Sequence, residues 1–238
     1  MNERCERVCL HLRCIVRRIR DIGRDIAGIL RELQPQPAKA MTIGEDHWLD
    51  GVQRDPIPGG AIMAIRRFLV IHFTAGATGQ SSIGYWKQLG NGVCAHFVIE
   101  RDGTIYQCRP CNRTAGHAGS SRWADPKTGI TYYGLNACSI GIELANGGDA
   151  FPERFSSLKP TIARHKNGGH AKEWETYPAA QLAACEELSR ALVARYHLDD
   201  VVGHEDIAPA RKNDPGPAFP MLALRKACGF KGLPAAQS

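Results

Sequence analysis

Short apolar runs alternate with segments of helical periodicity along this chain, and this pattern constrains the fold most. The runs at 66–73 and 139–144 are too short for core helices and are typical of buried strands. Residues 94–100 also alternate as a strand, and 101–104 predict a hairpin turn into a strand at 105–108. A short helix around 82–89 and a longer core-facing helix over 179–196 are expected, with a short strand at 201–202 and loop over 146–177. Strands mixed with helices and joined partly by a hairpin predict an α/β domain with a mixed central sheet flanked by helices.

A different pattern occupies the N-terminal residues. From Val8 to Leu33 apolar residues recur every three or four positions, with most arginines off that face, which predicts an amphipathic helical arm over 1–34. The arm could contact an anionic membrane surface, self-associate through 8–33, or dock on its own domain. Residues 35–61, which contain four prolines, read as a linker or lead-in, and the main domain is expected at 62–230.

The distribution of charge limits the partners and targeting segments that we expect. The net charge is +6, and residues 1–40 hold nine Lys/Arg against five Asp/Glu, so most of the excess lies in the arm. A positive surface attracts nucleic acid, anionic lipid or cell-wall polymer alike; no nucleic-acid motif is present, and we expect no nucleic-acid partner. Charges interrupt every apolar run of the arm, so neither a signal peptide nor a membrane span is expected.

The nine cysteines indicate the compartment in which the chain is made. An odd number of cysteines with no secretory signal indicates a reducing compartment, so we expect the protein to be cytoplasmic as synthesised. The Cys108/Cys111 pair lacks the two further ligands of a structural zinc site and is interpreted as incidental thiols.

A candidate metal site follows from three side chains. The proline-rich segment 203–217 carries His204, Lys212 and Asp214, and His72 ends the apolar run of the first strand, where it would face a cleft. Two imidazoles and one carboxylate leave a tetrahedral zinc ion an open position for water, which is typical of catalytic sites. Pro209 between His204 and Asp214, together with Pro215 and Pro217 just after them, stiffens this segment and reduces the entropy lost on holding the two residues in place.

Six ordered motifs between residues 62 and 228 resemble the zinc-dependent N-acetylmuramoyl-L-alanine amidases of type 2, which are related to peptidoglycan recognition proteins. The motifs are 68–75 (FLVIHFTA), 95–99 (AHFVI), 101–103 (RDG), 117–119 (HAG), 139–144 (SIGIEL) and 203–217 (GHEDIAPARKNDPGP). The resemblance implies that the chain hydrolyses the amide between N-acetylmuramic acid and L-alanine of peptidoglycan or a muropeptide. It also implies a Zn²⁺ cofactor.

The resemblance assigns a role to each matched position. His72, His204 and Asp214 would be the zinc ligands, and Glu143 and Lys212 would be the catalytic pair. His117 is expected to line the cleft, where substrate contact and structural support both remain open. His96 is expected to be a structural strand residue, since a fourth protein ligand would close the site.

Two departures from the family pattern bear on the branch and the substrate. Phage-type members carry tyrosine where this chain has Ala95, which favours the glutamate-dependent branch of muropeptide-recycling enzymes. Family members often carry tryptophan where this chain has Gly116, so one apolar wall of the cleft is absent. A phage or prophage endolysin and a recycling amidase both remain open, and the alternative from another class is a non-catalytic peptidoglycan-binding module.

Overall fold

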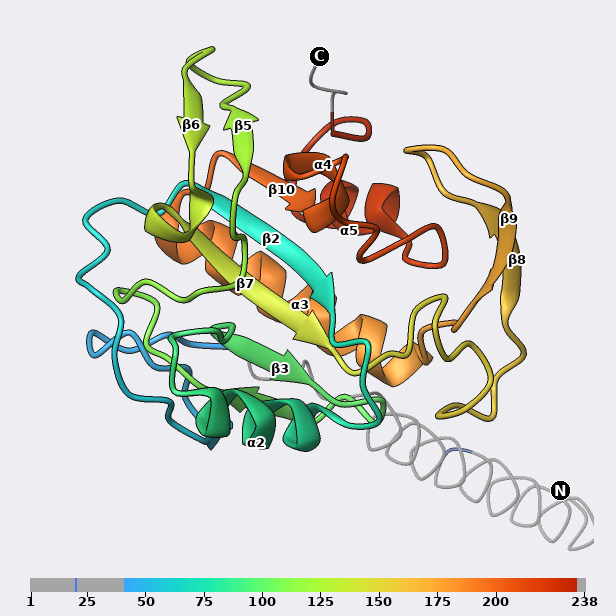
Figure 1. The fold of residues 1–238 in the computed structure, drawn as a ribbon. Coiled ribbons are helices and arrows are strands. Elements are labelled where there is room, and N and C mark those ends of the chain that lie inside the picture. The colour runs from blue at the N-terminus through green and yellow to red at the C-terminus, as the bar shows by residue number, and fades with distance from the viewer. Residues whose placement is uncertain (1–19, 21–40, 235–238) are drawn as a thin grey trace, which may run out of the picture. The chain divides into compact units, whose positions relative to one another are not determined.

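The computed structural model describes residue 20 and residues 41–234. This part of the chain forms ten strands, four α-helices and one 3-10 helix, and Figure 1 labels most of them. The elements of the main sheet are β1 (Gln53–Arg54), β2 (Phe68–Phe73), β3 (Phe97–Ile99), β4 (Ile105–Gln107), β7 (Ser139–Leu144) and β10 (Asp200–Gly203). Two hairpins are formed by β5 (Arg122–Ala124) with β6 (Thr131–Tyr133), and by β8 (Thr161–Arg164) with β9 (Ala171–Trp174). The helices are α2 (Gly79–Leu89), η1 (Leu135–Ala137), α3 (Ala179–Tyr196), α4 (His204–Ile207) and α5 (Met221–Ala227).

The main sheet has the strand order β1-β4-β3-β7-β2-β10. Its strand pairs are parallel except for the hairpin between β3 and β4, so the predicted mixed α/β sheet is confirmed. The parallel neighbours β3, β7, β2 and β10 therefore end at the same edge. In open α/β sheets this carboxyl edge is where ligands bind.

The two faces of the sheet carry different side chains. On β2, Leu69 and Ile71 pack in the core cluster that includes α3, which crosses behind the sheet in Figure 1, while Phe68 and Val70 belong to a second cluster. Because strand side chains alternate between faces, His72 shares the face of Phe68 and Val70. The strand thus delivers a histidine at its carboxyl end on the face away from α3.

The expected elements occur in the structure, several of them with different bounds. The strands expected at 66–73, 94–100 and 105–108 are β2, β3 and β4 over shorter ranges, and β5, β6 and α5 were not expected. The helix α3 covers 179–196 as predicted, whereas α2 begins at Gly79 because Thr78 caps it, with its side chain accepting from the Ser81 amide. Part of the loop expected over 146–177 is instead the β8–β9 hairpin. Most of its residues are exposed or half-buried, so no apolar alternation marked the strands.

The described part of the segment expected as a lead-in, residues 41–61, packs against the sheet. Ile43 and Leu49 are buried in the cluster that includes α3, and β1 pairs with β4 at the sheet edge. A compact unit begins at Met41. The division into arm (1–34), lead-in (35–61) and main domain (62–230) remains a prediction, and the arm, apart from Arg20, lies outside the described residues.

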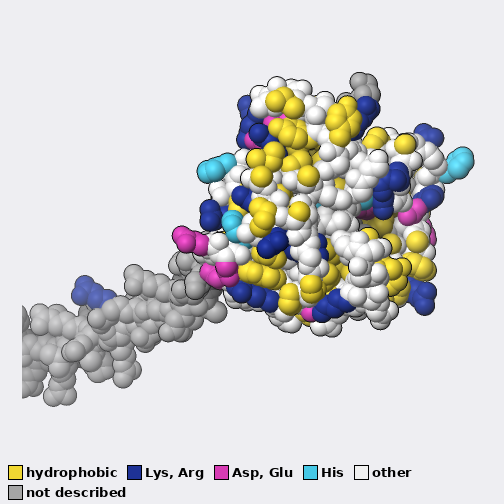
Figure 2. Space-filling model, turned by 60° about the vertical axis from the view of Figure 1, so that its left-hand side comes forward, with side chains coloured by type: hydrophobic (Ala, Val, Ile, Leu, Met, Phe, Trp, Pro, Cys, Tyr) yellow, Lys and Arg dark blue, Asp and Glu magenta, His cyan; other side chains and the backbone are white. Residues whose placement is uncertain are grey.

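The surface of this unit is chemically mixed. On the face drawn in Figure 2, Lys and Arg side chains are scattered among hydrophobic ones and form no single cationic stripe. None of the helices in the described ranges combines the length and the apolar character needed to cross a membrane.

Candidate functional site

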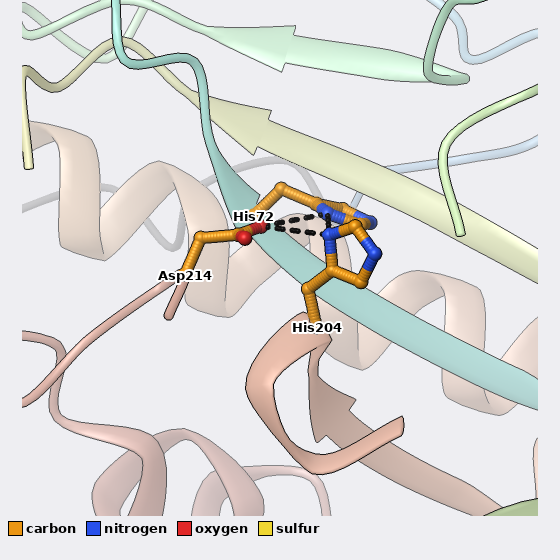
Figure 3. A group of neighbouring side chains, drawn as sticks. All are labelled: His72, His204 and Asp214. Atoms are coloured by element: carbon orange, nitrogen blue, oxygen red, sulfur yellow. Dashed lines mark hydrogen bonds and ion pairs between the residues drawn. The ribbon is translucent and has the colours of Figure 1, made fainter. Parts of the chain in front are cut away.

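Three side chains converge at the carboxyl edge of the sheet (Figure 3). His72 Nδ1 lies 2.9 Å from His204 Nδ1, and each of these nitrogens lies 3.0 Å from Asp214 Oδ2. The three residues are buried, with exposed fractions of 1%, 3% and 5%. The structure therefore brings together the three residues that the sequence predicts as metal ligands.

Local structure explains this convergence. The strands β2 and β10 are parallel neighbours in which Gly203 pairs with Ile71, so the residues that follow, His72 and His204, emerge side by side. The amide of Glu205 donates to the carbonyl of Asp214 at 2.8 Å, which folds the proline-rich segment back onto its own start. Asp214 is thereby held opposite the two imidazoles.

The outer nitrogens of both imidazoles have partners. His204 Nε2 donates to the Ala118 carbonyl at 3.2 Å, and His72 Nε2 lies 2.9 Å from His117 Nδ1. His117 Nε2 in turn reaches Ser139 Oγ at 3.3 Å. Because the Ala118 carbonyl can only accept, it places the ring proton of His204 on Nε2 and leaves Nδ1 to face Asp214, as in metal sites where an outer partner fixes the histidine tautomer.

The charge state of the cluster also suits a metal ion. Burial and the nearby His204 lower the pKa of His72 to about 4, so this imidazole is neutral at physiological pH. Burial acts to raise the pKa of Asp214, but the close approach of His204 and His72 outweighs it and holds the pKa well below its ordinary value. A neutral imidazole and an ionised carboxylate are the forms in which these side chains bind metals.

The spacing of the three donor atoms is close to that of metal coordination. A tetrahedral ion with bonds of 2.0–2.2 Å has neighbouring ligand atoms roughly 3.3–3.6 Å apart. The observed separations of 2.9 and 3.0 Å are a few tenths of an ångström shorter, so small side-chain rotations accommodate an ion. Within the described ranges, this is the group of His, Cys, Asp and Glu side chains that can hold a metal.

Glu143 lies directly beside the cluster. It is the register partner of His72 across β2 and β7, and its Oε2 atom is buried with no hydrogen-bond partner. Burial and the neighbouring Asp214 raise the pKa of Glu143 well above its usual value, while the positive charge of Lys212 opposes the rise. A buried acid with a raised pKa next to a metal site is typical of a catalytic group.

Lys212 lies in the same loop as Asp214. Its ammonium forms no ion pair with any residue that the structure describes, and its charge acts on both Glu143 and His72. The structure therefore places the two residues predicted as a catalytic pair within electrostatic reach of the three metal-ligand candidates.

His117 and His96 occupy supporting positions. His117 packs over Gly141, where an added Cβ would lie 2.6 Å from the imidazole, and it bonds the outer nitrogen of His72. His96 accepts from the Gly141 amide and bonds the Arg113 carbonyl, so both of its ring nitrogens are engaged by backbone. The substrate contact expected of His117 remains a prediction.

Two supporting groups gave no signal in the sequence. Asn136 Oδ1 accepts from the amides of His117 and Ala118, which fixes the carbonyl that bonds His204. The Glu205 carboxylate bonds His165 Nε2 at 2.6 Å and the Gly216 amide at 3.2 Å. Both contacts join residues distant in sequence, and neither lies in a spacing pattern that a sequence reading can detect.

Sequence comparisons identify a family and relatives for this chain. The N-acetylmuramoyl-L-alanine amidase family model (Amidase_2) matches residues 63–217. The amidase AmiD of Escherichia coli is 36% identical over 177 residues, covering 72% of this chain and 56% of that protein. The 1,6-anhydro-N-acetylmuramyl-L-alanine amidase AmpD of Salmonella typhimurium is 38% identical over 132 residues, covering 53% of this chain and 52% of that protein.

Solved structures extend the comparison to three dimensions. A complex of E. coli AmiD with the substrate anhydro-N-acetylmuramic acid-L-Ala-D-gamma-Glu-L-Lys aligns with a TM-score of 0.54 and 31% identity, covering 84% of this chain and 69% of that one. This chain spans about half the length of the curated relatives that it matches. Since the family model covers most of the chain and includes His72, Glu143, His204 and Asp214, the chain belongs to the N-acetylmuramoyl-L-alanine amidase family.

Proposed function

We propose that the chain is a zinc-dependent amidase that hydrolyses the amide between N-acetylmuramic acid and L-alanine of the stem peptide. The observation that carries this proposal is the convergence of His72, His204 and Asp214 beside the Oε2 atom of Glu143, which is buried and has no hydrogen-bond partner. Three nitrogen and oxygen ligands leave a zinc ion one position for water. A zinc ion held there would lower the pKa of a bound water toward neutrality and polarise a carbonyl.

The proposed roles of the other residues follow from their chemistry. Glu143 takes a proton from the attacking water and passes it to the departing amine of L-alanine, for which a buried carboxyl with a raised pKa is suited. The Lys212 ammonium stabilises the negative charge that develops on the scissile carbonyl oxygen. His117 positions His72 through the Nδ1–Nε2 contact.

The substrate is proposed to be peptidoglycan or a muropeptide such as the anhydro-muramyl peptide bound to AmiD. A non-catalytic binding module is the competing function, but a binder requires neither three converging donors nor a buried acid beside them. Two settings fit the enzyme: recycling of muropeptides in the cytoplasm, where the chain is proposed to be made, and wall lysis by a phage or prophage endolysin.

The test is turnover of a defined anhydro-muramyl tripeptide by the zinc-loaded protein, with product masses and zinc content measured together. We expect about one zinc per chain, release of the free tripeptide, and loss of activity on chelation with recovery on zinc addition. Glu143→Gln should keep its zinc and lose roughly 10²–10⁴-fold in kcat. His204→Ala should lose both zinc and activity. Full activity after complete zinc removal would exclude the proposed mechanism.

A further inference from the structure

A hollow lies at the edge of the sheet opposite to the metal-ligand candidates. It has a volume of about 400 Å³, and its lining residues are His47, Ile65, Arg66, Arg67, Arg195, Tyr196, His197 and Asp199. These residues lie where α3 ends and before β2 and β10 begin. Arg67 directly precedes β2 and His72 lies near its end, so at about 3.3 Å per residue the two positions are roughly 17 Å apart. The hollow is therefore separate from the proposed catalytic centre.

Two arginines of this lining have no acidic partner. Arg66 and Arg195 form no ion pair with the residues described, which are 41–234 and residue 20. Arg66 Nη1 donates to the Met63 carbonyl at 2.9 Å, and the Arg195 guanidinium lies over the ring of Tyr196. Most N–H donors of the two guanidinium groups are thus available to a ligand.

The acidic groups near the hollow are already neutralised. Asp199, its one acidic lining residue, pairs through Oδ2 with Arg67 at 2.8 Å and through Oδ1 with Lys127 at 2.7 Å. Asp46, a carboxylate whose charge acts on the lining, pairs with Arg54 at 3.4 Å. The charges of the two unpaired arginines therefore remain unbalanced, which favours an anionic ligand.

The lining is held in place around Tyr196. The guanidinium carbons of the two unpaired arginines lie 5.0 and 5.6 Å from the centroid of its ring, and its hydroxyl lies 2.9 Å from His47 Nδ1. His47 has a left-handed backbone with φ 64°, and the Cys111 amide and Gln107 Nε2 hold its carbonyl. Burial and then the charges of both arginines lower the pKa of His47, so the two charges act at one place. A ligand bound here meets positive groups that are positioned in advance.

We propose that this hollow binds a phosphomonoester group. Such a group carries a charge of about −1.5 to −2 at neutral pH and three acceptor oxygens, which two guanidinium forks and an imidazole can engage together. A carboxylate offers one charge and two oxygens, so it uses fewer of these donors. The hollow is larger than one phosphate group, and the side chain of Ile65, which is 45% exposed, gives an apolar contact for the organic part of the ester.

The test is a titration of the full chain with glycerol 3-phosphate, followed through the amide resonances of Tyr196 and His197. These signals report binding at the hollow and are insensitive to phosphate bound at the metal site. Arg66→Gln and Arg195→Gln should each raise Kd about three- to fivefold, and the double variant about tenfold. Amide resonances of the sheet strands show whether each variant remains folded. No saturable shift in wild type, or the same Kd in the double variant, would overturn the proposal.

Arg154 provides a matched control for Arg195. Both side chains are exposed, both lie over an aromatic ring, and Arg154 also forms no ion pair in the described part of the chain. Arg154 does not line the hollow. Arg154→Gln removes the same net charge and should leave Kd for glycerol 3-phosphate unchanged. An equal loss in Arg154→Gln would show that net charge alone attracts the anion, which would also overturn the proposal.

A second measurement distinguishes a soluble ester from a lipid headgroup. The full chain is sedimented with phosphatidylcholine vesicles that contain phosphatidic acid, and Arg154→Gln is compared with the double variant. A loss of vesicle binding in the double variant alone assigns the hollow to a lipid headgroup, whereas equal vesicle binding with weakened glycerol 3-phosphate binding assigns it to a soluble ester. Neither measurement involves turnover, so the result is independent of the amidase proposal.

Discussion

Gly141 shows how a single hydrogen atom in place of a side chain supports the site. An added Cβ would lie 2.6–2.9 Å from the ring atoms of His117, and that ring bonds the outer nitrogen of His72. His117 is buried beside β7 and cannot move aside without losing its contact with Ser139. The glycine is therefore required by packing, since its backbone is not in the left-handed region.

We expect Gly141→Ala to destabilise the protein by about 1–3 kcal/mol, because the methyl group must displace the His117 ring. The matched control is Gly84→Ala in α2, where an added Cβ meets nothing within 4 Å. That substitution should stabilise by about 0.5–1 kcal/mol through the higher helix propensity of alanine. Urea unfolding of both variants gives the signs, and destabilisation of the two by equal amounts would contradict the packing argument.

His96 is expected to make stability depend on acidity. Burial is the main cause that lowers its pKa to about 4 from an ordinary value of 6.5. Between these two pH values the unfolded chain binds a proton that the folded chain excludes, so stability falls as the pH drops through this window. The full effect is roughly 3 kcal/mol at the lower end.

The measurement is the free energy of unfolding of metal-free protein at several pH values from 7 to 4, for wild type and His96→Gln. Glutamine retains an amide donor for the Arg113 carbonyl that His96 Nε2 bonds, but it does not titrate. The variant should start less stable and lose less stability on acidification. Parallel curves for the two proteins would show that His96 makes no contribution to acid sensitivity.

Among the structural elements, the β8–β9 hairpin has the clearest link to the site. Its residues His165 and Lys166 both bond the Glu205 carboxylate, which is 5% exposed and directly follows His204. The same carboxylate accepts from the Gly216 amide, two residues after Asp214. One buried acid therefore links the hairpin to both ends of the segment that carries two of the candidate metal ligands.

We expect Glu205→Gln to weaken zinc binding about 10–100-fold, the usual effect of losing a group that orients metal ligands. The amide cannot accept from both His165 and Lys166 with the strength of a carboxylate, so the segment 204–216 loses part of its support. Competition with a chelator measures the zinc affinity. Glu173→Gln, an exposed substitution on the same hairpin, is the control and should retain full affinity.

These elements also show which parts of the fold could be predicted from the sequence alone. The strands β2 and β7 and the helix α3 could be predicted because buried elements carry continuous or periodic apolar residues. The hairpin could not, because a mostly exposed strand pair shows no apolar period, although the Asn167-Gly168 pair in its turn is a hairpin signal. Contact of Glu205 with His165 depends on tertiary packing across 40 residues, for which the sequence carries no local pattern.

For the site, residue chemistry was more informative than secondary structure. His72, His204 and Asp214 could be named from side-chain type, their places after strands, and the motif resemblance. Their separations and the partners of their outer nitrogens could not, because these depend on strand register and on loops such as 117–119 and 135–137. In the structure, Asn136 accepts from the His117 amide and Ser139 contacts the His117 ring, so both residues support the partners of the metal-ligand candidates.

At the scale of the whole molecule, charge and core are unevenly divided along the chain. Residues 1–40 carry four of the six excess positive charges, whereas the sheet, its core clusters and the candidate metal ligands all belong to the compact unit that begins at Met41. A unit with its own hydrophobic core is able to fold alone. Attraction to anionic surfaces and hydrolysis should therefore be separable by truncation.

We expect a chain lacking residues 1–40 to hydrolyse a soluble muropeptide with kcat/KM within about twofold of the full chain, because none of the candidate catalytic or ligand residues is removed. Binding to vesicles that contain anionic lipid should weaken, since the net charge falls to +2, and the difference should shrink at high salt. Sedimentation with vesicles at two salt concentrations measures this, and neutral vesicles are the control.

The same truncation distinguishes the two proposed settings. If it weakens the killing of intact cells while isolated wall is still cleaved, the arm serves lysis. If neither the killing nor the cleavage changes, a recycling role is favoured, because a recycling enzyme meets its substrate in solution.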